Sequence, residues 1–178
     1  ETDTDEKLKN GLIGEIMVRP KISFGFMQGY LGMPDKSFEA YRNFWFHTGD
    51  AGFFNKKNHL VFVDRIKDCI RRRGENISSY EVEQAFLKIP QIAEAAAYAV
   101  PAKDHGQEDE VMVALMIIKG SKIEYSKWIN KVSTDLAKFA IPLYLRVMKS
   151  FPKTQTGKII KHALRTEGIT NDTWKNNL

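Results

Sequence analysis

The chain has 178 residues, of which 43% are hydrophobic and 28% charged, a composition typical of a folded domain and not of a membrane protein. Its net charge of +5 fits nucleic acid and smaller polyanionic ligands equally well. The single cysteine, Cys69, excludes an internal disulfide and predicts a reducing, cytoplasmic location.

Neither a metal site nor a membrane span is expected. The histidines share no metal-ligand spacing with one another or with Cys69; they are His47, His59, His105 and His162. The longest apolar stretches, residues 92–100 and 111–118, are too short to cross a bilayer.

The first third of the chain predicts a β-rich unit. Gly14–Arg19 alternates apolar and polar residues like a half-buried strand. A loop-rich stretch punctuated by glycines follows, and Asn55–Asn58 between two apolar runs predicts a hairpin over residues 53–63. Up to about Asp64 the pattern is too short and irregular for a complete domain.

Beyond Arg65 helices and strands alternate. Ser78 and Glu81 form a capping box, and apolar residues at helical spacing follow as far as Pro90. Further elements are expected as strands at 92–100, 111–118 and 143–147 and as helices at 125–136 and 159–165. This alternation predicts a compact α+β or α/β domain, and Asp64–Asp68 is interpreted as a linker.

The first segment with chemical potential is Pro152–Lys158, a Gly-Lys pair in a Thr-rich loop. A mobile ammonium there can meet a phosphoryl oxygen. It is not a Walker A loop, because Pro152 stands where a glycine is required and Ile159 replaces the Ser or Thr that holds Mg²⁺. Taken alone, these residues favour a surface turn with a solvated lysine.

Two other segments are equally ambiguous when taken alone. In His47–Asp50, the Asp50 carboxylate can accept bonds from a ribose, although a capped turn explains the pattern better. Arg71–Arg73 precedes Gly74 without interleaved aromatics, which favours a solvated basic loop, or one that meets ligand phosphates, over a nucleic-acid patch. Gly74 predicts either a positive φ or a close approach of the backbone to a ligand.

The order and spacing of these segments resemble the late motifs of the adenylate-forming superfamily, which includes acyl- and aryl-CoA ligases, peptide-synthetase adenylation domains and beetle luciferases. The resemblance covers essentially the whole chain. The matching motifs are Thr48-Gly49-Asp50, Asp64-Arg65-x-Lys67-Asp68, Gly74-Glu75-Asn76-Ile77, Glu81-Val82-Glu83 and Pro152-Lys153-Thr154-x-x-Gly157-Lys158.

The resemblance implies an α+β fold in two parts. Residues 1–66 are expected to be the last, β-rich part of a large amino-terminal domain, namely the end of its β-barrel subdomain. Residues 67–178 are expected to form a small α/β carboxy-terminal lid domain with a short mixed sheet flanked by helices. Lys67 falls at the family's hinge position.

The family activates a carboxylic acid in two steps. The carboxylate first attacks the α-phosphate of ATP, which is bound with Mg²⁺, to give an acyl-adenylate and pyrophosphate; a thiol, usually that of CoA, then displaces AMP. The resemblance implies that Lys158 is catalytic in the first step and that Asp50 and Arg65 contact the ribose hydroxyls, with Thr48 beside them in the nucleotide site. It also implies that the loop of Gly74 and Glu75 faces the CoA tunnel.

The subfamily motifs resemble acyl-CoA ligases of the carnitine/crotonobetaine or fatty-acid type. No Ser-Gly-Thr-Thr-Gly-type loop for the ATP phosphates occurs in the chain. The expected function is therefore that of a carboxy-terminal fragment of an AMP-forming acid–CoA ligase, inactive alone. Its expected partners are ATP, CoA, a carboxylic acid and its own amino-terminal domain, and not nucleic acid. The alternatives are a non-catalytic nucleotide- or CoA-binding module of the same fold and an adenylation domain that loads a carrier protein.

Overall fold

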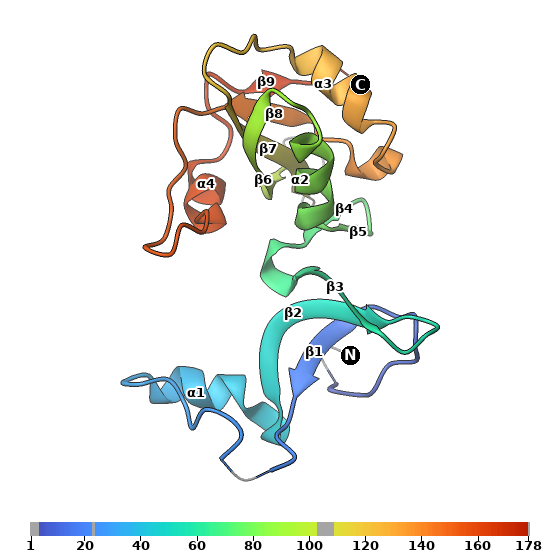
Figure 1. Cartoon of the computed structure of the whole chain (residues 1–178), viewed down its shortest axis with the longest axis vertical. Helices are drawn as coiled ribbons and strands as arrows, with labels where there is room; N and C mark the ends of the chain where they lie inside the picture. The colour runs from blue at the N-terminus through green and yellow to red at the C-terminus, as the bar shows by residue number, and fades with distance from the viewer. Residues whose placement is uncertain (1–3, 23, 103–108, 178) are drawn as a thin grey trace. The chain divides into compact units, whose positions relative to one another are not determined.

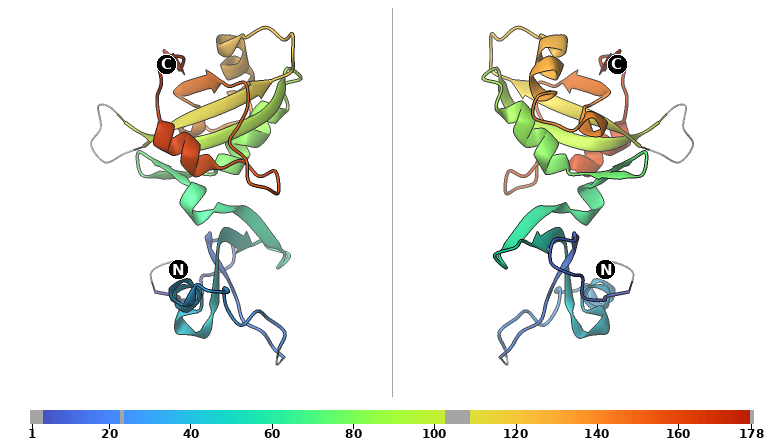
Figure 2. Two further views of the ribbon diagram at one scale, coloured as in Figure 1. Left: turned by 90° about the vertical axis from the view of Figure 1, so that its left-hand side faces the viewer. Right: turned by 90° about the vertical axis from the view of Figure 1, so that its right-hand side faces the viewer.

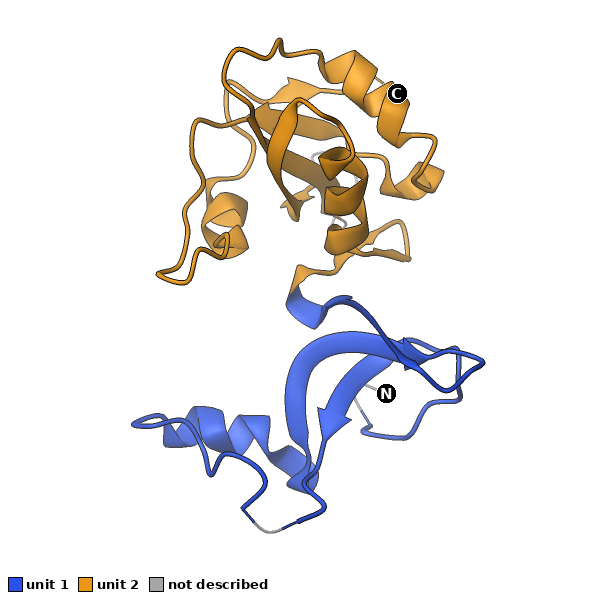
Figure 3. Cartoon of the chain, viewed as in Figure 1, with its two compact units in different colours: residues 1–67 blue, residues 68–178 orange. Residues whose placement is uncertain are grey.

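The chain forms two compact units, residues 1–67 and 68–178 (Figure 3). The computed structural model describes residues 4–22, 24–102 and 109–177. His105 lies outside this described part. No helix within the described ranges is long and apolar enough to cross a bilayer.

The first unit contains a three-stranded antiparallel sheet, in the order β1-β2-β3 (Figure 1). Its strands are β1 (Gly14–Val18), β2 (Phe46–Phe54) and β3 (Leu60–Arg65). The predicted hairpin is confirmed: the Asn55 N–H donates to the carbonyl oxygen of His59 at 3.0 Å, and Asn58 takes a φ of +61° in the turn. The β-rich character expected of this part is therefore correct.

A helix in the first unit was not predicted. It is α1 (Pro34–Ala40), followed by the 3₁₀ turn η1 (Arg42–Phe44). Pro34 stands in its first turn, where a missing N–H has no cost. None of the α1 residues is buried. The helix therefore needs no apolar face, and the sequence lacks the helical spacing of apolar residues that would have predicted it.

The second unit contains a four-stranded mixed sheet, in the order β6-β7-β8-β9. Its strands are β6 (Ile92–Pro101), β7 (Asp109–Ile117), β8 (Tyr144–Val147) and β9 (Trp174–Lys175). The pairings are antiparallel, parallel and antiparallel in that order. The three strands predicted in this unit are confirmed, and the mixed sheet agrees with the expected fold class. The two-residue β9 was too short to predict.

Three helices pack on this sheet, two on one face and one on the other (Figure 2). α2 (Ser79–Leu87) and α3 (Tyr125–Val132) share one hydrophobic cluster with alternate residues of β6 and β7. α4 (Lys161–Glu167) contributes Leu164 to a second cluster with the intervening residues, among them Tyr98 and Met112. Both faces of β6 and β7 are buried, which explains why they read as continuous apolar runs.

Short elements connect these layers. The 3₁₀ turn η2 (Ile66–Asp68) spans the end of the first unit and the start of the second. A two-stranded hairpin of β4 (Ile70–Arg72) and β5 (Glu75–Ile77) precedes α2, and η3 (Lys138–Ala140) precedes β8. The predicted N-cap of α2 is present, since the Ser78 hydroxyl oxygen accepts from the Glu81 N–H at 3.2 Å.

Candidate functional site

The capped turn expected at His47–Asp50 is a bulge within β2, and the Thr48 hydroxyl caps it rather than the Asp50 carboxylate. His47 pairs with Met17 and Ala51 with Glu15, so five residues of β2 oppose three of β1. The Thr48 hydroxyl donates to the Ile16 carbonyl oxygen at 2.6 Å and accepts from the Asp50 N–H at 3.1 Å. Gly49 takes a φ of +71°. Thr48 therefore holds the bulge that presents Asp50.

Glu15 supports the same bulge from the neighbouring strand, a role that the sequence analysis missed. Its side chain is 5% exposed. One carboxylate oxygen accepts from the Gly49 N–H at 3.0 Å, and the other lies 2.8 Å from Nδ1 of His47 and 3.5 Å from the Arg42 guanidinium. An acidic residue at a buried strand position is the signal that points to such a partner.

Asp50 and Arg65, both predicted to contact a ribose, are cross-strand partners in the β2–β3 pair. Nε of Arg65 lies 3.5 Å from Oδ1 of Asp50, and the two side chains are 57% and 34% exposed. The structure thus brings these two residues together, with polar atoms accessible to a ligand.

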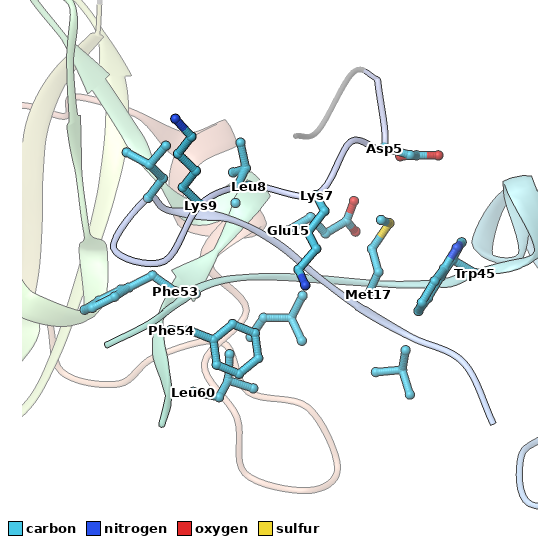
Figure 4. Close-up of a pocket in the computed structure, with 15 residues that line it drawn as sticks. Asp5, Lys7, Leu8, Lys9, Glu15, Met17, Trp45, Phe53, Phe54 and Leu60 are labelled. Carbon is cyan, nitrogen blue, oxygen red and sulfur yellow. The ribbon is translucent and has the colours of Figure 1, made fainter. Parts of the chain in front are cut away.

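A pocket of about 490 Å³ in the first unit is separate from this pair. Its lining is mostly apolar and includes Leu8, Leu12, Met17, Trp45, Phe53 and Phe54 (Figure 4). It also includes Glu15 but not Thr48, Asp50 or Arg65. The pocket is therefore not the ribose site predicted from the sequence.

Gly74 lies at the tip of the β4–β5 hairpin. Arg72 pairs with Glu75, which leaves Arg73 and Gly74 as a two-residue loop with φ values of +52° and +79°. Positive φ at both positions defines a type I′ turn, which glycine favours. The predicted positive φ is confirmed, and a Cβ on Gly74 would meet nothing within 4 Å. Glu75 is exposed beside this turn.

The interpretation of Arg71–Arg73 as a solvated basic loop is wrong for Arg72. This residue is 7% exposed, and its Nε lies 2.6 Å from Oε2 of Glu110, which is 5% exposed. Its Nη1 donates to the carbonyl oxygens of Phe139 and Ile141 at 2.9 and 3.0 Å. Only Arg71 and Arg73 are exposed, because alternate residues of a strand face opposite sides.

Lys158 lies in a tight hairpin of its own. The Gly157 N–H donates to the Thr154 carbonyl oxygen at 2.9 Å, the Thr154 N–H donates to that of Lys158 at 2.8 Å, and Gly157 has a φ of +82°. This is a type I turn closed by a glycine bulge, a defined geometry rather than a loose loop. The Lys158 side chain is exposed and makes no ion pair or hydrogen bond among the described residues.

The predicted residues are distributed over both units. Thr48, Asp50, Arg65 and Lys67 belong to the first, and Gly74, Glu75 and Lys158 to the second. Lys67 is exposed within η2 and is the last residue of the first unit. Within the described ranges no group of three or more His, Cys, Asp and Glu residues has the geometry of a metal site.

The chain is similar to a known protein family and to several curated proteins. A family model described as the AMP-binding enzyme C-terminal domain matches residues 81–158. The oxalate–CoA ligase of Saccharomyces cerevisiae is 36% identical over 164 residues, which are 91% of this chain and 29% of that protein. The crotonobetaine/carnitine–CoA ligase of Proteus mirabilis is 28% identical over 162 residues, 90% of this chain and 31% of that protein.

Solved structures of similar fold cover nearly the whole chain. ATP-bound MatB from Rhodopseudomonas palustris matches with a TM-score of 0.80 and 27% identity, covering 94% of this chain and 32% of that one. The amide bond synthetase McbA from Marinactinospora thermotolerans matches with a TM-score of 0.78 and 29% identity, covering 93% and 33%. The chain thus spans about a third or less of the length of its relatives.

The mixed sheet, its three helices and the Gly-Lys hairpin define a carboxy-terminal domain of the adenylate-forming kind. The chain belongs to the adenylate-forming superfamily, of which it carries the AMP-binding enzyme C-terminal domain. The curated relatives that it matches include an oxalate–CoA ligase, a long-chain-fatty-acid–CoA ligase and a crotonobetaine/carnitine–CoA ligase.

Proposed function

We propose that this chain is the carboxy-terminal part of an AMP-forming acid–CoA ligase. The observation that carries the proposal is the Lys158 hairpin, in which a hydrogen-bonded turn presents an exposed ammonium group. The hairpin lies in a domain that matches the AMP-binding enzyme C-terminal domain. The Asp50–Arg65 pair supports it as a place where a ribose can bind.

The chemistry of these residues fits the two half-reactions. Negative charge accumulates on the carboxylate and α-phosphate oxygens as the acyl-adenylate forms, and a positioned ammonium such as Lys158 stabilises that charge. The Asp50 carboxylate can accept hydrogen bonds from ribose hydroxyls while Arg65 donates to them. We assign Thr48 to the support of Asp50, and any ligand contact of its hydroxyl is secondary to that role.

The second half-reaction needs a different surface. We propose that the β4–β5 turn, with Gly74 and Glu75, then lines the path of the CoA thiol, since a glycine at its tip leaves space for a pantetheine chain. Rotation about Lys67 in η2 would exchange the Lys158 hairpin for this turn. Mg²⁺ would enter only with the bound ATP.

The first unit is proposed to complete a β-barrel subdomain with strands of a large amino-terminal domain. That domain would supply the loop for the ATP phosphates and the acyl pocket. The cytoplasmic location inferred from Cys69 stays a prediction.

The test uses the full-length enzyme with ATP, CoA and a panel of acids chosen from the relatives: oxalate, benzoate, cinnamate, crotonobetaine and long-chain fatty acids. We expect AMP, pyrophosphate and one acyl-CoA as products. Lys158→Ala should lower acyl-adenylate formation about 10²- to 10³-fold, measured by ATP–pyrophosphate exchange, and leave thioester formation from supplied acyl-adenylate largely intact.

A matched control is Lys119→Ala, which removes another exposed lysine next to a glycine of positive φ, Gly120. It should leave both half-reactions unchanged. Equal loss of both half-reactions in Lys158→Ala would contradict the assigned role. Transfer of the acyl group to a carrier protein but not to CoA would contradict the proposed acceptor.

A further inference from the structure

We infer that Lys161 is a positioning residue for Lys158, and that it acts through an ion pair with Glu83 across the open edge of β6. The inference rests on the proposed function, because it specifies how the first half-reaction obtains its lysine in a fixed place. Three lysines lie within nine residues, Lys153, Lys158 and Lys161, and the structure gives each different surroundings.

The Lys158 hairpin connects directly to α4. Ile159 pairs with Lys153 in an isolated bridge, and the Ile160 N–H donates to the Pro152 carbonyl oxygen at 2.8 Å, which closes the base of the hairpin. α4 begins at the next residue, Lys161. With only two residues between them, movement at the start of α4 is transmitted to Lys158.

The start of α4 is held by a largely buried polar cluster. Nζ of Lys161 lies 2.6 Å from Oε1 of Glu83 and donates to the Ser79 hydroxyl oxygen at 2.7 Å. The Lys161 and Glu83 side chains are 16% and 14% exposed, and Ser79 is fully buried. An ion pair shielded to this degree is stronger than one in water and is less screened by salt.

Glu83 also binds the sheet. Its Oε1 accepts from the N–H of Ala97 at 2.9 Å. Because β6 is an edge strand, its outward N–H groups have no ladder partner and need another acceptor. Glu83 supplies that acceptor from α2 while it holds α4, which packs on the opposite face of the sheet. One carboxylate thus couples both helices over the strand edge.

The other end of the hairpin has a second, more exposed attachment. Nζ of Lys153 lies 2.7 Å from Oε2 of Glu94, also on β6, and the side chains are 37% and 27% exposed. Both flanking lysines are therefore bound to the β6 side of the domain, and of these three lysines Lys158 is the one without an ion pair within the described ranges. The Lys161–Glu83 ion pair is less exposed to solvent than the Lys153–Glu94 pair, so it should contribute more to holding the Lys158 hairpin in one position.

The experiment compares Lys161→Met and Lys161→Arg in the full-length enzyme, with the acid identified by the panel above. Lys161→Met should lower ATP–pyrophosphate exchange about 10- to 100-fold through misplacement of Lys158, while thioester formation from supplied acyl-adenylate stays near wild type. Hydrogen exchange of the amides of residues 154–160 should become faster. Lys161→Arg keeps the charge and should restore most of both properties.

Lys127→Met is the matched control, because it breaks an exposed Lys–Glu pair on α3 with Glu124 and should change neither readout. Glu83→Gln, which can still accept from Ala97, should reproduce the effect of Lys161→Met in weaker form. The inference is overturned if Lys161→Met leaves adenylation and hydrogen exchange unchanged, or if both half-reactions fall together. Absence of exchange in the wild type with every acid would instead count against the proposed function, and hydrogen exchange would still decide the role of Lys161.

Discussion

Tyr98 has its ring fully buried on β6, and its hydroxyl makes no hydrogen bond to the described residues. Burial raises the pKa of Tyr98 to about 12, although the charge of Arg146 opposes this effect. In the unfolded chain the pKa is near 10. A raised folded-state pKa means that the stability is complete below pH 10 and is lost as the pH rises toward 12. The expected loss is about 1.4 kcal/mol at pH 11.

Tyr98→Phe should remove this alkaline loss and change the free energy of unfolding at neutral pH by less than about 1 kcal/mol, since no hydrogen bond is broken. Urea unfolding of both proteins at about pH 8 and pH 11 measures the difference. Tyr80→Phe, at a half-exposed position of α2, serves as the control. Parallel alkaline losses in wild type and Tyr98→Phe would show that this hydroxyl is not responsible.

The identity of a residue does not show whether its side chain is bound within the protein or is available to a ligand, as Lys158 and Lys161 illustrate. The Gly-Lys pair indicated Lys158, whose catalytic role stays a prediction; its ammonium group makes no ion pair or hydrogen bond within the described ranges. Nothing in the sequence marked Lys161 as bound, because its partners Glu83 and Ser79 lie about eighty residues away in the chain. The same limit applies to Glu15, whose contact with Gly49 depends on strand register. Roles set by long-range contacts need the fold.

At the scale of elements, the β4–β5 hairpin depends on the Arg72–Glu110 pair. Both side chains are nearly inaccessible, and the guanidinium also binds two carbonyl oxygens at η3. Arg72→Met leaves the Glu110 carboxylate buried without its partner, which should destabilise the second unit by about 3–5 kcal/mol. Arg72→Met combined with Glu110→Leu should recover much of that loss, because an apolar pair replaces the buried charge.

Thermal or urea unfolding of the chain measures these changes. The exposed pair Lys88–Asp135 provides the comparison, and Lys88→Met should cost no more than about 1 kcal/mol. A similar small cost for Arg72→Met would show that water reaches the Arg72 site. A double variant as unstable as Arg72→Met alone would mean that the bonds to η3, rather than the ion pair, stabilise the hairpin.

The elements that could be predicted are those with a local signal. β6 and β7 are continuous apolar runs, α2 has its serine cap and apolar spacing, and the β2–β3 hairpin has its asparagine turn. α4 begins two residues later than predicted, because Ile159 and Ile160 complete the Lys158 hairpin. α1 and β9 have no buried stripe of helical or strand period, so no local pattern identified them.

The two units differ in how much apolar core they contain. The second has two hydrophobic clusters on the two faces of its sheet. In the first, Ala51 is the only buried hydrophobic residue within the described ranges, while Leu12, Leu31 and Phe62 are at least half exposed. A unit with so little buried apolar surface is marginal alone. The exposed residues and the apolar pocket are what a neighbouring domain of the proposed ligase would cover.

The 178-residue chain alone should therefore form no acyl-CoA, even with ATP, CoA and the correct acid. Its first unit buries almost no apolar side chain within the described ranges, and the sequence contains no Ser-Gly-Thr-Thr-Gly-type loop to hold the ATP phosphates. Hydrogen exchange should show unprotected amides in β1–β3 of the isolated chain and protected ones in the full-length enzyme, whereas the β6 and β7 amides should be protected in both. Thioester formation by the isolated chain, or equal protection of β1–β3 in both proteins, would mean that the first unit is complete by itself.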